Sequence, residues 1–143
     1  MPTAHAAPLP ARLPVSPVFR ALADPTRVRI LHLLRQGALC VGDLVAVLAI
    51  PQPKASRHLA YLRRALLVED ERRGAWSFYR LAPARPGFHQ KLLELLDAAA
   101  AEVPGAAADG TALRKLSSKG GCCPQHTKAR SHTTKARSRT HGR

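Results

Sequence analysis

Long hydrophobic runs are absent from this 143-residue chain, and aromatic residues make up only 4% of it. No apolar stretch approaches the roughly 20 residues that a transmembrane helix needs, so we expect no membrane-spanning segment. The Ala- and Pro-rich N-terminus lacks a basic start followed by an apolar stretch, so we expect no secretory signal peptide. Three cysteines are too few for a disulfide framework, which favours the reducing cytoplasm.

Acidic residues are also scarce, and the chain is strongly basic as a result. Nine Asp and Glu face 23 Lys and Arg, which gives a formal net charge of +14. A small soluble chain with this charge is expected to bind a polyanion, most often nucleic acid. We do not expect an enzyme, because no carboxylate pair, Ser–His–Asp set or Gly-rich phosphate loop can be assembled from the sequence.

The uneven distribution of charge predicts three segments. Residues 1–15 are expected to be a flexible N-terminus, and residues 16–104, with thirteen basic and eight acidic residues, the folded domain. Residues 105–143 carry nine basic residues and one acidic residue, and almost nothing apolar follows Leu116. Such a polar segment cannot offset the entropy of ordering it, so we expect 105–143 to be a disordered basic tail.

Apolar spacing and helix-start signals predict a mainly α fold with one β-hairpin, in the α+β class. Ser16 before Pro17 and Asp24 before Pro25 are each predicted to cap the start of a helix. Further helices are expected at about 41–48, 52–66 and 86–103, and Arg73-Gly74 predicts a hairpin within 68–81. The resulting order is helix, helix, helix-turn-helix, hairpin, helix.

The helix at 52–66 is predicted to read DNA. Its inward positions are taken by Ala55, Leu59, Leu62 and Leu66, which leaves a polar opposite face and a polar N-terminal end. The second helix of a helix-turn-helix enters the major groove, where Gln and Arg can hydrogen-bond to base edges. The alternative is a solvated, positively charged helix surface. The candidate DNA contacts on this helix are Gln52, Lys54, Ser56, Arg57, His58, Tyr61 and Arg64.

The hairpin adds basic residues beside that helix. Arg72 and Arg73 precede the turn glycine and suit contacts to phosphate or to the minor groove. Trp76 and Phe78 are expected to pack the hairpin against the helices. Arg80 is expected to be either a solvated strand residue or a phosphate contact.

Four separate stretches resemble the ArsR-type winged helix-turn-helix regulators, in order and at that family's spacing. They are residues 19–31 (FRALADPTRVRIL), 38–41 (ALCV), 52–59 (QPKASRHL) and 74–81 (GAWSFYRL), and the similarity covers about 17–97. It implies a cytoplasmic homodimeric repressor with a hairpin wing, which leaves its operator when an inducer binds. Two departures are Pro51, where the family usually has a Ser cap, and Leu66, where Gly is common.

The resemblance also directs attention to the cysteines. The arsenite-responsive type usually carries Cys-x-Cys before the third helix; here Cys40 keeps the first position and Gly42 replaces the second. Three thiolates suit a soft As(III) or Sb(III) ion, and we expect Cys40, Cys122 and Cys123 to supply them. The zinc type uses Asp/His pairs on the last helix, where only His89 and Asp97 are present, so we reject it.

Other inducers stay open at this point. Cys122 and Cys123 alone could hold a singly methylated arsenical, which needs two thiolates. Oxidation to a disulfide between Cys40 and the tail is another way to clamp the start of the helix at 41–48 and so to pull on the helix-turn-helix. Zinc or copper with His126 is a weaker alternative, because a second folded ligand is missing.

The apolar stripe of the last helix predicts a homodimer. A domain of about 80 residues has little spare core to cover this stripe, so a second copy is expected to bury it. The helix at 16–23 should contribute, and Leu92→Glu is expected to dissociate the dimer. Two recognition helices about 34 Å apart would read an inverted-repeat operator. The alternative from a different class is a nonspecific nucleic-acid-binding basic protein.

Overall fold

The computed structural model describes residues 12–121, which form a winged helix-turn-helix domain. The predicted order of helices and hairpin is confirmed, and two further elements are present, the short strand β1 and the helix α6. Along the chain the elements are α1 (Val15–Leu22), α2 (Pro25–Leu34), β1 (Leu39–Cys40), α3 (Val41–Leu48), α4 (Gln52–Arg64), β2 (Val68–Arg73), β3 (Trp76–Leu81), α5 (Phe88–Ala99), a 3-10 turn (Ala100–Glu102) and α6 (Ala106–Ser118).

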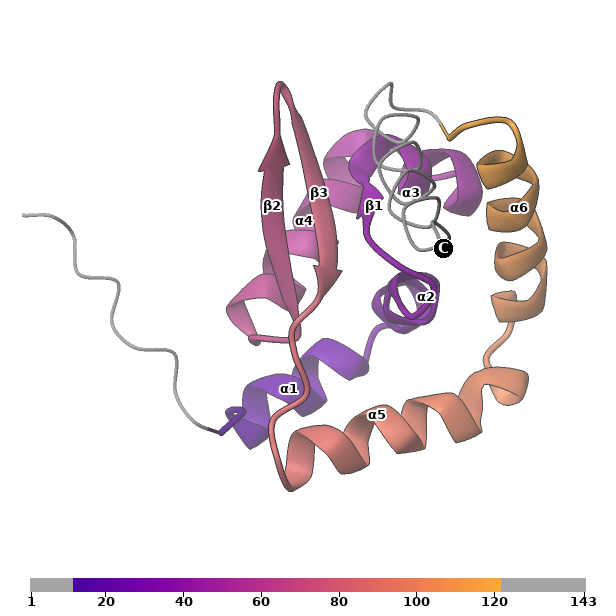
Figure 1. The fold of residues 1–143 in the computed structure, drawn as a ribbon. Helices are drawn as coiled ribbons and strands as arrows, with labels where there is room; N and C mark the ends of the chain where they lie inside the picture. The colour runs from indigo at the N-terminus through magenta and orange to yellow at the C-terminus, as the bar shows by residue number, and fades with distance from the viewer. Residues whose placement is uncertain (1–11, 122–143) are drawn as a thin grey trace, which may run out of the picture.

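The wing is an antiparallel sheet with strand order β1-β3-β2. The hairpin pairs Asp70 with Tyr79, and β1 adds Cys40 opposite Phe78 on the other edge of β3. Gly74 has φ 63° at the hairpin turn, a conformation that glycine adopts without steric cost. Figure 1 shows the hairpin rising from the helices, with α5 across the foot of the molecule.

The core lies between α2, α3, α4 and the base of the wing. Ile30, Leu44 and Leu59 have essentially no exposed surface. The predicted inward face of α4 is confirmed at Ala55, Leu59 and Leu62, whereas Leu66 lies beyond the helix end with φ 64° and is half-buried.

One of the two predicted caps is confirmed and the other is wrong. Asp24 caps α2, since its Oδ1 accepts from the backbone N–H of Arg27 at 3.1 Å. Ser16 does not cap α1, which begins at Val15 after Pro14 without a side-chain cap. The N–H groups of the whole first turn lack intrahelical partners, so Pro17 is tolerated at the third helical position as well as the first.

The prediction that the chain is disordered from residue 105 is wrong for residues 106–118. Figure 1 shows α6 turning back beside α2 and α3. Leu113 is buried there, and the Asp109 carboxylate accepts from Nε and Nη2 of Arg29 at 2.7 Å each. The predicted flexible N-terminus also ends early, because Leu13 is buried. Residues 1–11 and 122–143, including the rest of the predicted tail, lie outside the described residues.

The apolar stripe on α5 is divided between the core and the surface. Leu92 and Leu96 are buried within the single chain, while Leu95 is 62% exposed. Leu92→Glu would therefore damage the domain itself, and it is the wrong substitution for testing a dimer. Over residues 12–121, none of the helices has the length and apolar character needed to cross a membrane.

Candidate nucleic-acid interface

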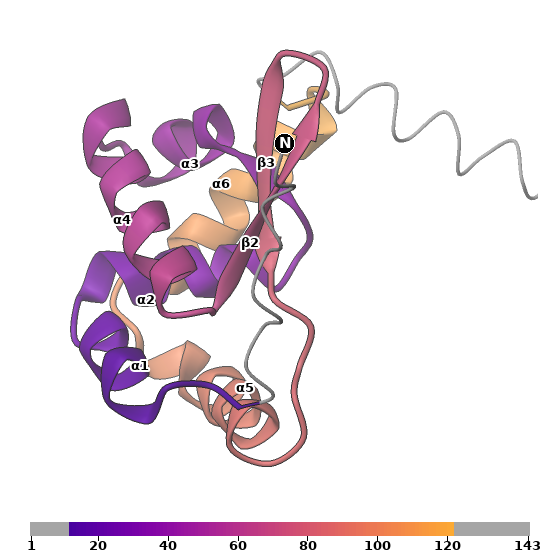
Figure 2. The same cartoon turned by 90° about the vertical axis from the view of Figure 1, so that its left-hand side faces the viewer.

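The helix-turn-helix is formed by α3 and α4, which lie along one side of the molecule next to the wing (Figure 2). Helix α3 ends at Leu48 and is followed by Ala49, which has φ 53° and ψ 44°. This left-handed residue stops the helix, and Ile50-Pro51 leads into α4. The short turn therefore fixes where the N-terminus of α4 begins.

The N-terminal end of α4 is exposed and has no acidic neighbours in its own helix. Gln52, Lys54, Ser56 and Arg57 are all exposed, in agreement with a surface that faces outward. Pro51 provides no side-chain cap. Pro53 has no N–H group and the Lys54 N–H donates to the Pro51 carbonyl at 3.0 Å, so the Gln52 N–H is the first-turn donor that faces outward. Within residues 12–121, neither Lys54 nor Arg57 forms an ion pair, which leaves both cations available to an outside anion.

The C-terminal half of α4 differs, because its polar side chains have partners inside the molecule. The Arg27 guanidinium lies 4.1 Å from the centre of the Tyr61 ring, and Arg64 lies 5.9 Å from the same ring. His58 is half-buried with its Nδ1 3.5 Å from Arg27 Nη1, and burial lowers the pKa of His58. The sequence analysis grouped His58, Tyr61 and Arg64 with the DNA contacts. It did not predict the contact of Arg27 with Tyr61; the available sequence signal was the position of Arg27 next to the helix cap Asp24.

The wing separates arginines that looked equivalent in sequence. Arg73 Nη2 lies 3.4 Å from Glu71 Oε2, and its guanidinium lies 4.6 Å from the Phe78 ring centre. Arg80 pairs with Glu69 at 3.3 Å and with Glu71 at 3.8 Å. Arg72 is exposed and forms no ion pair within the described part of the chain.

The two wing aromatics behave differently from one another. Phe78 is fully buried, so its predicted packing role is confirmed. Trp76 is 40% exposed, pairs with Arg73 next to the turn, and is not among the side chains that pack against the core. The expectation that Trp76 packs the hairpin onto the helices is wrong.

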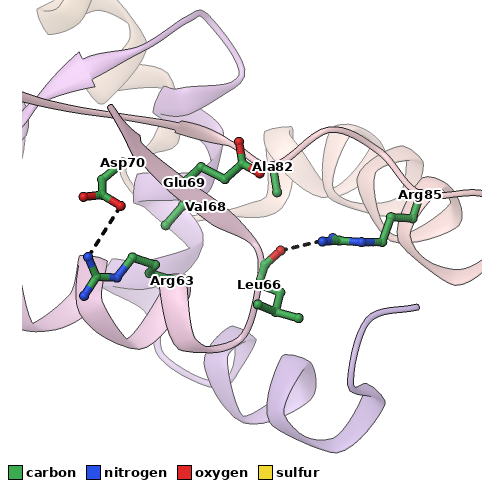
Figure 3. Close-up of a pocket in the computed structure, with 7 residues that line it drawn as sticks. All are labelled: Arg63, Leu66, Val68, Glu69, Asp70, Ala82 and Arg85. Atoms are coloured by element: carbon green, nitrogen blue, oxygen red, sulfur yellow. Dashed lines mark hydrogen bonds and ion pairs between the residues drawn. The ribbon is translucent and has the colours of Figure 1, made fainter. Parts of the chain in front are cut away.

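A cleft of about 260 Å³ lies where α4 meets the base of the wing (Figure 3). Arg63 Nη1 lies 3.5 Å from Asp70 Oδ1 across it, and Arg85 Nη1 donates to the Leu66 carbonyl at 3.5 Å. Both arginines thus have partners within the chain. The cleft lies between the recognition helix and the wing, and Arg63 is paired with an acidic residue there whereas Arg85 donates to a backbone carbonyl.

Cys40 is the only member of the predicted thiol site within the described residues. It is buried and caps α3: its Sγ accepts from the Asp43 N–H at 3.4 Å, and Asp43 Oδ2 accepts from the Cys40 N–H at 3.2 Å. Leu39, next to Cys40, lines a cavity together with Ser117 and Ser118 from the end of α6. Cys122 and Cys123 lie outside the described residues, as does His126.

No cluster of three or more metal-binding side chains is found between residues 12 and 121. The rejected zinc pair has other roles, since His89 is buried with its Nδ1 accepting from the Arg85 N–H at 3.1 Å. Asp97 accepts from Arg35 Nε at 2.7 Å.

Residues 24–70 match the family model described as bacterial regulatory protein, arsR family. The arsenical resistance operon repressor of Escherichia coli K12 is 46% identical over 83 residues, covering 57% of this chain and 70% of that protein. The arsenic resistance transcriptional regulator ArsR1 of Pseudomonas putida is 47% identical over 78 residues, covering 54% of this chain and 61% of that protein. In the Pseudomonas case the alignment therefore spans less than two thirds of the relative.

Two solved structures support the fold. HlyU from Vibrio cholerae is 32% identical with a TM-score of 0.53, covering 59% of this chain and 88% of that structure. A homodimeric winged helix-turn-helix DNA-binding domain from Mycobacterium bovis is 33% identical with a TM-score of 0.54, covering 62% and 79%.

Proposed function

We propose, because this chain belongs to the arsR family of bacterial regulatory proteins, that it represses transcription by binding operator DNA and is released by a thiol-binding inducer. Like its family, it is a regulator and not an enzyme. The observation that carries the DNA-binding proposal is the exposed N-terminal end of α4, with Gln52, Lys54 and Arg57 directed away from the core. A cytoplasmic location accords with this role.

Base reading is assigned to α4 and backbone contact to the wing. Arg57 and Gln52 have donor patterns that match guanine and adenine edges in the major groove. Lys54 and Ser56 suit phosphates beside the helix N-terminus, and Arg72 suits a phosphate next to the wing. His58, Tyr61, Arg64 and Arg73 were candidates from sequence, and their intramolecular partners favour supporting roles for them.

A homodimer is supported by apolar surface on α1 and α5. Val15, Phe19 and Leu95 are each more than half exposed, and Phe19 contacts Phe88 with ring centres 5.9 Å apart, which joins the two helices. The similar domain from Mycobacterium bovis is homodimeric. Burying these side chains on a second copy would place two α4 helices on successive major grooves of an inverted repeat.

The dimer can be tested at Leu95. Leu95→Glu should give a monomer in light scattering at micromolar concentration and lose operator binding, because the charge would be buried at the interface. Leu95 is exposed in the single chain, so the variant should keep its thermal stability as a monomer. Glu94→Gln, a neighbouring exposed position, is the matched control and should remain dimeric. A dimeric Leu95→Glu variant would contradict this interface.

As(III) or Sb(III) is the inducer that the cysteines and the named relatives favour. Helix α6 ends at Ser118, beside the Leu39 that precedes Cys40, so the chain leaves the described region at residue 121 near the start of α3. Cys122 is the next residue along the chain. Three thiols and As(OH)₃ would form an As(III) tris-thiolate and three waters, with no change in oxidation state.

Release from DNA would follow from a change at the Cys40 cap of α3. The sulfur that would bind As(III) also accepts the hydrogen bond that begins α3. Binding the ion would pull on the helix that sets the position of α4, and a differential stabilisation of a few kcal/mol suffices to displace DNA. A disulfide between Cys40 and a tail cysteine would act on the same cap. A methylated arsenical on Cys122 and Cys123, or zinc or copper with His126, would bind the tail without Cys40.

Fluorescence anisotropy with duplexes selected from a random pool tests the proposal. A repressor should prefer its selected duplex over random DNA by ~10³-fold or more, whereas a nonspecific nucleic-acid binder would show a steep salt dependence and little preference. Arsenite should release the reduced protein, and Cys40→Ser should abolish release if three thiols bind. Response of Cys40→Ser but not of Cys122→Ser would leave the two-thiol version, and an unresponsive wild type would overturn arsenic sensing.

A further inference from the structure

Arg27, on α2, joins three helices through one side chain. Its Nε donates to the carbonyl of Ala21 at 2.7 Å and its Nη2 to the carbonyl of Arg20 at 3.1 Å, both at the C-terminus of α1. The face of the same guanidinium covers the Tyr61 ring of α4 at 4.1 Å. One planar group therefore links the end of α1 to the recognition helix.

The chemistry of this contact requires arginine. The carbonyls at a helix C-terminus carry partial negative charge, so a cation that donates to two of them is favourable. The Arg20 carbonyl also accepts from the Ala23 N–H at 3.3 Å, so at that carbonyl the guanidinium adds a second donor. A guanidinium can donate in its plane while its face stacks on an aromatic ring. A lysine ammonium has no such face and cannot reproduce both contacts at once.

Arg27 is poorly placed to bind DNA itself. Its side chain is only 14% exposed, and its donors are directed at Ala21, Arg20 and the ring nitrogen of His58. By contrast, the ion pair that joins the same C-terminal part of α4 to the wing, Arg63 with Asp70, is about half exposed on both sides. Exposed pairs contribute little, so the Arg27 contacts are the stronger constraint on the direction of α4.

We propose that Arg27 is a positioning residue that fixes the orientation of α4 relative to α1, and thereby the separation of the two recognition helices in the DNA-bound dimer. The inference rests on the proposed function, because α1 is held near the two-fold axis only if Val15 and Phe19 lie in the dimer interface. A rotation of α4 against α1 would then move the N-terminal end of α4 in both half-sites. Half-site spacing is a geometric consequence of that separation.

The test compares duplexes that differ only in the distance between half-sites. Wild type and variants are titrated with the selected inverted repeat and with repeats that are one base pair longer or shorter, at several salt concentrations. Arg27→Lys should reduce the preference for the selected spacing by about 2- to 30-fold. Its salt slope and its preference within each half-site should not change, since no phosphate or base contact is lost.

Matched variants separate positioning from other roles. Tyr61→Leu removes the ring and should reproduce the loss of spacing preference, while Tyr61→Phe keeps the ring and should restore it. Arg64→Gln removes the more distant and exposed cation over that ring, so its spacing preference should stay that of wild type. Tyr61→Leu also keeps the inference falsifiable if Arg27→Lys does not fold.

Three outcomes would overturn the inference. An unchanged spacing preference in both Arg27→Lys and Tyr61→Leu would show that another contact orients α4. A salt slope reduced by about one in Arg27→Lys would make Arg27 a phosphate contact. A wild type without preference between the selected repeat and random duplexes would overturn the proposed function, and the inference with it.

Discussion

The two helices of the helix-turn-helix begin in opposite ways. Helix α3 starts with a capping box in which Cys40 and Asp43 satisfy each other's backbone N–H groups, and both residues are 1% exposed. Helix α4 starts at Pro51 with no side-chain cap, and its first polar residues are exposed. One helix start is thus closed within the protein, and the other is open to the outside.

This difference indicates what each helix start does. A helix N-terminus is a site of partial positive charge that an anion can satisfy. At α3 the protein itself supplies the acceptors, so any ligand there must displace them, as we propose for a thiol-binding inducer. At α4 the Gln52 N–H and the exposed Lys54 and Arg57 can meet acceptors from DNA, and these side chains have no acidic partner within the described residues.

The wing extends the comparison. Helix α4 carries four Lys and Arg and no acidic residue, whereas β2 and β3 carry three arginines and three acidic residues. Basic composition alone therefore does not identify DNA contacts. The absence of an intramolecular partner is the better criterion.

The largest expected effect is a loss of folding stability when the capping box at the start of α3 is removed. Asp43→Ala removes the acceptor of the Cys40 N–H and should lower the free energy of unfolding by about 2–3 kcal/mol. Ser56→Ala near the open start should change it by less than about 0.5 kcal/mol. Urea denaturation measures both, and equal losses would remove the distinction between the two helix starts.

Removing a side chain at the open start should instead affect DNA recognition. Arg57→Ala and Gln52→Ala should each lower discrimination between the operator and a mutated operator by about 1–3 kcal/mol, as the loss of a base-edge contact does. Arg63→Ala is the matched control on the same helix, because Arg63 pairs with Asp70. If Arg63→Ala lowers discrimination as much as Arg57→Ala does, the absence of an intramolecular partner does not identify the residues that contact DNA.

Much of this arrangement could be predicted from sequence, for identifiable reasons. Apolar periodicity fixed the buried face of α4, and the Asp24-Pro25 signal marked the start of α2, because both depend on neighbouring residues. Helix α6 was missed because it has little apolar surface and is held to α2 by Asp109 and Arg29, which lie 80 residues apart. Periodicity also could not tell that Leu92 faces the core while Leu95 faces outward.

The wing arginines provide a smaller test of the same criterion. Arg72→Ala should reduce the slope of log affinity against log salt by about one, because one phosphate contact is lost. Arg73→Ala should change the slope less, since Glu71 and the Phe78 ring already engage that guanidinium. The slopes come from anisotropy titrations at a series of salt concentrations, and a larger change for Arg73→Ala would contradict the assignment.

The smallest expected effect is a loss of folding stability at low pH. It tests α4, because His58 is the only histidine in α3 or α4. Burial lowers the pKa of His58 below that of an unfolded chain, about 6.5. The unfolded state then binds more protons, so the stability contributed by neutral His58 is complete above pH 6.5 and is lost as pH falls through the folded pKa.

Urea denaturation from pH 7.5 to 5 measures this loss. Burial lowers the pKa values of His32 and His89 in the same direction, so wild type should lose stability over the whole interval. His58→Gln should show a shallower decline than wild type. An identical decline would mean that His58 does not contribute.

Sequence selection from a random duplex pool tests the central claim, that the open start of α4 reads DNA, most directly. Wild type should select an inverted repeat, and Arg57→Ala should lose its preference at one position in each half of that repeat while keeping the others. The same preference at every position in both proteins would contradict the claim.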